Sequence, residues 1–255
     1  MTSIARDELI QFLDDYLSVR TIRDASVNGL QVIGRESVKR VALGVSANLD
    51  LFTEAARWQA DIVLVHHGLL WRDEPRRVDE LVKRRLKLLL DNDITLLAYH
   101  LPLDAHAEVG NNIQILQRLG LNLESRNLGL YDGTYLGVIG RTSAPMPLAE
   151  FVDLVNALFQ ATALALPFGP KQVQRIGIVS GGAAGELTSA VEQHCDVYLT
   201  GEAREATPAL CREWGINYIA AGHYNTEKFG VIALGDLIRD KMGLETKFID
   251  VPNSL

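Results

Sequence analysis

Two adjacent histidines, His66 and His67, are the residues of this chain best suited to metal chemistry. They follow the sequence Ile-Val-Leu-Val at residues 62–65, whose apolar, β-branched character is typical of a strand buried on both faces of a parallel sheet. Gly68 then allows the chain to turn, so that both imidazoles can approach one point. Because open α/β sheets bind ligands at the carboxyl ends of their strands, we expect a site here. The pair alone is also compatible with one buried structural histidine and one solvated histidine.

A second strand end carries similar residues. The predicted strand at residues 94–98 leads into His100, and Asp104 follows four residues later. Pro102 disfavours a helix through this segment, so we expect His100 and Asp104 to lie on an irregular loop at the same sheet edge.

A third strand end completes the pattern. The predicted strand at residues 218–221 leads into His223 and Glu227, which are four residues apart and so share one face of a helix. These three strand ends hold four of the six histidines in the chain. Their joint concentration indicates a metal site more strongly than any one of them.

The ligand set indicates the metals and the chemistry. Three imidazoles and two carboxylates suit zinc, manganese, iron or nickel better than calcium. The set exceeds what a single catalytic zinc takes, so we expect two divalent metal ions per chain, with Glu227 as a natural bridge. Two such ions activate a shared water for hydrolysis. His100 then serves as a general acid or base, or makes a structural hydrogen bond, and both alternatives stay open.

The elements that must position these residues alternate along the chain, which predicts an α/β fold with mainly parallel sheets. A polar, glycine-bearing stretch at residues 122–133 indicates a boundary between two domains, 1–128 and 129–255, and the C-terminal segment could pack onto the first. Predicted helices cover residues 5–17, 49–58, 77–90, 111–119 and 148–158, and predicted strands cover residues 28–32, 38–45, 135–141, 173–179, 197–199 and 246–249.

Composition excludes several classes of protein. The net charge of −7 disfavours nucleic-acid binding, and no apolar run approaches the roughly 20 residues that a membrane-spanning helix needs. Cys195 and Cys211 form no C-x-x-C motif, and nothing resembling a secretory signal precedes the first predicted helix, which predicts a cytoplasmic protein. The glycine-rich stretch at residues 180–186 fits neither the dinucleotide pattern nor the Walker pattern, so it is a weak nucleotide signal.

Six motifs resemble those of the NIF-three-like proteins, also named GTP cyclohydrolase I type 2 homologues. They are NGLQV at residues 28–32, VHHG at 65–68, AYHLPLDAH at 98–106, VGNN at 109–112, LTGE at 199–202 and AGHYNTE at 221–227. The resemblance implies that two metal ions are bound by His66, His67, Asp104, His223 and Glu227. It also implies two similar α/β domains that meet at a dinuclear metal site, and a homohexamer built from dimers.

The family name implies that metal-activated water opens the imidazole ring of GTP or a related nucleotide. The ligand set supports the water activation, whereas the sequence does not reveal residues that read a base or bind phosphates. The leading hypothesis is therefore a dinuclear-metal-dependent hydrolase acting on a small molecule. The alternative is a non-enzymatic metal-binding scaffold or regulatory protein.

Overall fold

The computed structural model describes residues 3–72 and 77–253, which form two compact units. The first unit contains Met1–Leu103 and Gly230–Pro252, and the second contains Asp104–Phe229 and Asn253–Leu255. The expected boundary at residue 128 falls within a strand, β7, Asn122–Tyr131. Every helix in the described part of the chain is too short or too polar to cross a bilayer.

The first unit is built on a five-stranded sheet with the order β13-β4-β5-β6-β2. β13, β4, β5 and β6 run parallel and β2 pairs antiparallel with β6, so the expected mainly parallel sheet is confirmed for this unit. The continuous apolar runs of β5 and β6 are buried, as both faces of a parallel sheet require. The strands are β2 Gly29–Val32, β4 Arg40–Ser46, β5 Ile62–His67, β6 Thr95–Ala98 and β13 Glu245–Phe248.

Helices of the first unit pack against this sheet. Phe52 and Leu89 join Val63 and Leu96 of the strands in one apolar core. Asn48 and Asp79 cap the two helices that carry these residues by accepting hydrogen bonds from backbone N–H groups. The helices are α1 Arg6–Tyr16, η1 Val19–Thr21, α2 Leu49–Arg57 and α3 Glu80–Asp91, and a small two-stranded sheet pairs β1 Ile4–Ala5 with β3 Ser37–Val38.

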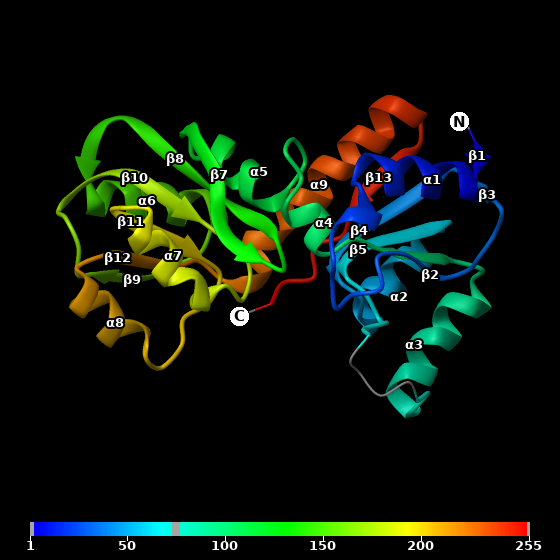
Figure 1. The fold of residues 1–255 in the computed structure, drawn as a ribbon. Helices are drawn as coiled ribbons and strands as arrows, with labels where there is room; N and C mark the ends of the chain where they lie inside the picture. The colour runs from blue at the N-terminus through cyan, green and yellow to red at the C-terminus, as the bar shows by residue number, and fades with distance from the viewer. Residues whose placement is uncertain (1–2, 73–76, 254–255) are drawn as a thin grey trace. The chain divides into compact units, whose positions relative to one another are not determined.

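The second unit holds a six-stranded sheet with the order β7-β8-β10-β11-β12-β9. β10, β11 and β12 run parallel, whereas β7, β8 and β9 pair antiparallel, so this sheet is mixed and the expectation of a mainly parallel sheet is wrong here. α7 lies over this sheet (Figure 1), with Leu187 and Ala190 in the core. The strands are β7, β8 Thr134–Pro147, β9 Leu164–Pro167, β10 Gln172–Ile178, β11 Val197–Thr200 and β12 Asn217–Ala220. The helices are α5 Asn111–Arg118, α6 Leu148–Phe159, η2 Ala184–Glu186, α7 Leu187–Glu192 and α8 Thr207–Trp214. Two further helices belong to both units: α4 Leu101–Asp104 begins in the first unit and ends in the second, and α9 His223–Met242 begins in the second and continues into the first.

Residues 122–133, where we expect the domain boundary, form β7 and the turn into β8. β7 is the edge strand of its sheet and most of its side chains are exposed, which accounts for the polar sequence. Gly129 and Gly133 have positive φ, so these glycines serve the irregular strand and its turn.

The two units share one scaffold, which the sequence reveals only as a common βα rhythm. The order α1-β2-β4-α2-β5-α3-β6 in the first unit matches α6-β9-β10-α7-β11-α8-β12 in the second. In each unit three parallel strands lie side by side, and an earlier strand pairs antiparallel with the third.

An aspartate at the start of the central parallel strand has the same partners in both units. Asp61 Oδ2 accepts hydrogen bonds from the N–H groups of Lys39 and Arg40, at 2.7 and 2.9 Å. Asp196 Oδ2 accepts from those of Gln174 and Arg175, at 2.9 and 2.8 Å. Each carboxylate therefore satisfies donors where the preceding strand begins, which helps to fix the register of the parallel strands.

Replacing Asp196 with alanine should lower the free energy of unfolding by about 1–3 kcal/mol, because two backbone donors lose their acceptor. The measurement is urea denaturation of the full chain, with the exposed Asp153→Ala on α6 as the control. Equal midpoints for the two variants would contradict the anchoring role.

Candidate metal centre

Three imidazoles gather in the first unit at the carboxyl ends of neighbouring strands. His66 and His67 end β5, and His100 follows β6. Their ring centroids lie 4.7 Å apart for His66 and His67, 4.9 Å for His66 and His100, and 5.4 Å for His67 and His100. Each ring offers a nitrogen within 4.8 Å of the others, so the three could hold a metal ion.

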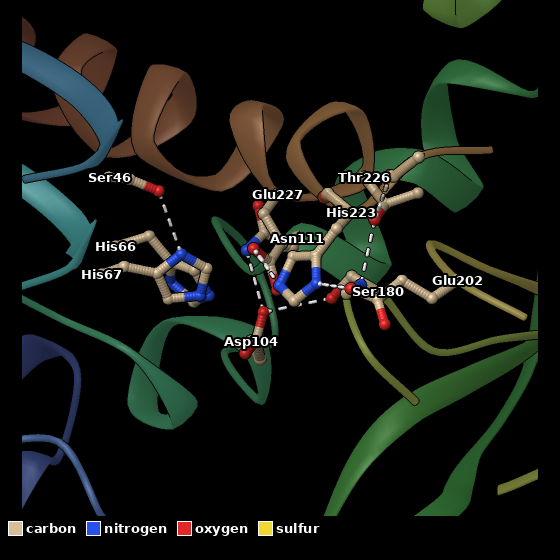
Figure 2. A network of polar contacts seen from close by, with 12 residues as sticks. Ser46, His66, His67, Asp104, Asn111, Ser180, Glu202, His223, Thr226 and Glu227 are labelled. Carbon is tan, nitrogen blue, oxygen red and sulfur yellow. Dashed lines mark hydrogen bonds and ion pairs between the residues drawn. The ribbon is translucent and has the colours of Figure 1, made fainter. Parts of the chain in front are cut away.

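Hydrogen bonds orient the first two rings. His66 is fully buried, and its Nδ1 donates to the carbonyl oxygen of Tyr99 at 2.9 Å, so in the neutral imidazole Nε2 carries the lone pair. His67 Nδ1 is hydrogen bonded to Ser46 Oγ at 3.2 Å (Figure 2). Such contacts through one ring nitrogen are typical of histidines that bind a metal through the other.

Gly68 is required by a close approach of chain segments. A Cβ atom there would lie 2.3 Å from the side-chain nitrogen of Gln31 on β2. Gln31 in turn accepts hydrogen bonds from the N–H groups of Leu69 and Leu70. The chain therefore turns away from the histidines along a path that a larger residue would block.

His100 has a carboxylate partner that the sequence analysis did not identify. Its Nδ1 donates to Asp24 Oδ1 at 2.9 Å, and buried Asp24 also accepts from the Asn28 side chain and from backbone N–H groups. Burial raises the pKa of Asp24, but the hydrogen bond and the charge of His100, together with the bonds from Asn28 and Ser26, lower it to about 2. The only sequence signal is the Asp-Ala-Ser turn, which is common in loops.

The donors of the second unit begin with Asp104. The expectation of an irregular loop is wrong: α4 is a single helical turn, in which Pro102 occupies the second position and needs no N–H partner. Asp104 Oδ1 accepts from Asn111 Nδ2 at 2.8 Å and from Ser180 Oγ at 3.1 Å (Figure 2). These bonds fix a carboxylate whose residue is only 7% exposed.

His223 and Glu227 lie on the first turns of α9, as their spacing predicts. His223 Nε2 lies 3.1 Å from Glu227 Oε2, and its Nδ1 lies 2.5 Å from Glu202 Oε1 (Figure 2). Burial lowers the pKa of His223, but the hydrogen bonds and charges of Glu227 and Glu202 outweigh it and raise that pKa to about 9. Glu202 is a partner that the sequence analysis missed, although the LTGE motif contains it.

Glu227 is 3% exposed and closely confined. A Cβ atom on Gly181 would lie 2.1 Å from Glu227 Oε1, and Gly181 has a φ of +66°. The N–H of Gly181 donates to Thr226 Oγ1 at 2.9 Å, which holds this loop against α9. Oxygen atoms of Asp104 and Glu227 lie within 4.8 Å of one another.

Both donor sets fit divalent metals. Neutral imidazoles and buried carboxylates are the ligands that zinc, iron, manganese and nickel take in proteins. The first unit brings together His66, His67 and His100, and the second brings together Asp104, His223 and Glu227.

Known proteins match this chain along almost its whole length. The model of the Duf34/NIF3 (NGG1p interacting factor 3) family matches residues 4–254. A Pseudomonas aeruginosa protein named "GTP cyclohydrolase 1 type 2 homolog" is 43% identical over 98% of this chain and 99% of its own length, and an Archaeoglobus fulgidus protein of the same name is 38% identical over 97% and 98%. Two solved structures share the fold: protein ybgI, of unknown function, has a TM-score of 0.94 at 37% identity over 99% of this chain and 100% of its own, and TTHA1606 from Thermus thermophilus has 0.90 at 36% over the same shares.

Gly181→Ala should cost about 1–3 kcal/mol more stability than Gly120→Ala, because the new methyl group must displace Glu227. Gly120 is a matched control: its φ is +68°, and nothing lies within 4 Å of an added Cβ. Urea denaturation of both variants gives the difference. Equal losses would mean that positive φ alone, and not the contact with Glu227, makes glycine necessary at residue 181.

Proposed function

The chain belongs to the Duf34/NIF3 family, and from this premise we propose that it is a dinuclear-metal-dependent hydrolase. One observation carries the proposal: two buried carboxylates, Asp104 and Glu227, lie close together among hydrogen-bonded partners. Burying two like charges this close is costly unless a cation accompanies them. A divalent metal ion would offset that cost.

The proposed ligands come from both donor sets. His66 and His67 supply ring nitrogens whose orientation is fixed through their Nδ1 atoms, and Asp104, His223 and Glu227 supply the remaining donors. His100, of the histidine set, directly precedes the short α4, and Asp104, of the second set, ends it, so the two sets are linked by a single helical turn of the chain. In this proposal the five residues would hold two divalent ions of zinc, iron, manganese or nickel, and Glu227, with two carboxylate oxygens, would serve both.

His100 is the proposed general acid or base. Asp24 holds its Nδ1–H, so Nε2 is the atom that can exchange a proton with a reacting group. When bound, the metal ions supply the Lewis acidity that activates water for hydrolysis. The curated relatives carry the name GTP cyclohydrolase 1 type 2 homolog, which makes GTP or a related nucleotide the first substrate to test.

Untagged protein should carry about two divalent ions per chain by elemental analysis, and Glu227→Gln should lose at least one because a neutral amide is a poor bridging ligand. The exposed Glu213→Gln on α8 is the matched control and should keep both ions. Absence of metal from the unmodified protein after growth with each of the four metals would overturn the metal assignment.

With the metal restored, a screen of GTP, other nucleotides and phosphoesters should show release of formate or phosphate. His100→Ala should lower that turnover about 10²–10⁴-fold while metal content stays near two ions per chain. The mass of the assembly, measured in parallel, tests the homohexamer that the family resemblance implies. Two retained metal ions without turnover of any compound would favour the metal-binding scaffold instead.

A further inference from the structure

The second unit contains a cavity of about 610 Å³ beside Glu202. It lies at the carboxyl ends of β11 and β12 and next to the first residue of β9. Its volume suits a small organic molecule, and the carboxyl ends of parallel strands are where α/β sheets bind ligands. The lining residues are Ala161, Thr162, Leu164, Gly201, Glu202, Ala203, Ala220, Ala221, Gly222, Asn225 and Asn253.

The shared scaffold explains why this cavity exists. In the first unit the corresponding strand ends, those of β5 and β6, carry His67 and His100. The connection from α1 to β2 there spans residues 17–28 and brings Asp24 and Asn28 onto His100. In the second unit the connection from α6 to β9 spans only residues 160–163, and glycine and alanine follow β11 and β12. Larger side chains therefore stand at these strand ends in the first unit, whereas small residues line the cavity at the equivalent ends in the second.

The lining determines which ligand chemistry fits. Among the described lining residues, Glu202 carries the only charge, so the lining offers a phosphate group a carboxylate and no cationic side chain of its own. Oε1 of Glu202 is hydrogen bonded to His223. Because an ionised carboxylate only accepts hydrogen bonds, its other oxygen suits an N–H donor of a ligand. The small residues at the ends of β11 and β12 present backbone and Cβ atoms, a surface that suits a flat ring.

We propose that this cavity binds a planar nitrogen heterocycle that carries an amino group, with the amino N–H donating to Glu202 and any phosphate held outside. Binding of the ring requires only the cavity. Its role as a substrate subsite rests on the proposed function, because Glu202 contacts His223, one of the proposed metal ligands.

The test uses adenine as the probe and unsubstituted purine as its analogue without the amino group. Both are titrated into chelator-treated full-length protein, and binding is followed by ligand-observed NMR. Adenine should bind with a dissociation constant on the order of a millimolar, as expected for a ligand of this size, and about tenfold more tightly than purine. Inorganic phosphate should not displace it.

Two variants locate the binding. Glu202→Gln should weaken adenine binding about tenfold through loss of the charged acceptor, and Ala161→Leu should weaken it by narrowing the cavity at that wall. Ala209→Leu makes the same change at an exposed alanine of α8 outside the lining and should bind adenine normally.

The outcomes separate this proposal from that of the metal centre. Adenine binding that is equal in Ala161→Leu and Ala209→Leu, equal binding of purine and adenine, or displacement by phosphate would overturn the cavity proposal. Metal content is measured on the same samples before chelation. If the protein carries no metal at that stage but binds adenine, the dinuclear centre alone is rejected. If it carries metal but does not bind adenine, the cavity proposal alone is rejected.

Discussion

The anchoring of two neighbouring parallel strands by an aspartate is the contact on which the rest of each unit depends. Asp61 and Asp196 fix where the central strand starts relative to its neighbour, and strand register then carries that alignment to the opposite end. In the first unit this register pairs Ser46 with His67, which is why the Ser46 hydroxyl reaches the His67 ring. A hydrogen bond at the amino ends of the strands thereby helps to position donors at their carboxyl ends.

Hydrogen bonds already hold donor side chains in place, so these side chains lose little conformational freedom when a ligand binds. Tyr99 orients His66 through a backbone carbonyl, and Asn111 and Ser180 hold Asp104 through side chains. Preorganisation of this kind lowers the entropy lost on binding. The structure also places bulky residues and small residues at equivalent strand ends, so one scaffold provides both a donor cluster and a cavity.

The local sequence pattern reveals the strands that carry the site, because β5, β6 and β12 each contain a short apolar run that can be recognised without knowledge of distant residues. Asp24 and Glu202 escaped the sequence analysis for the opposite reason. Asp24 meets His100 across 76 positions of sequence and Glu202 meets His223 across 21, and neither spacing leaves a periodic signal. The edge strands β7 and β9 were missed since exposed or short strands need no alternating apolar pattern.

The pairing of β13 with β4 has a consequence for how the chain is made. Arg40 and Glu245 face each other across 205 positions, so the first sheet acquires its strand β13 only after the whole second sheet has been synthesised. The strands of the second sheet all lie between Asn122 and Ala220, so that sheet can be complete while β13 is still untranslated. During this interval β4 has an edge without its native neighbour, and its apolar sequence makes this edge a place where the nascent chain can pair wrongly.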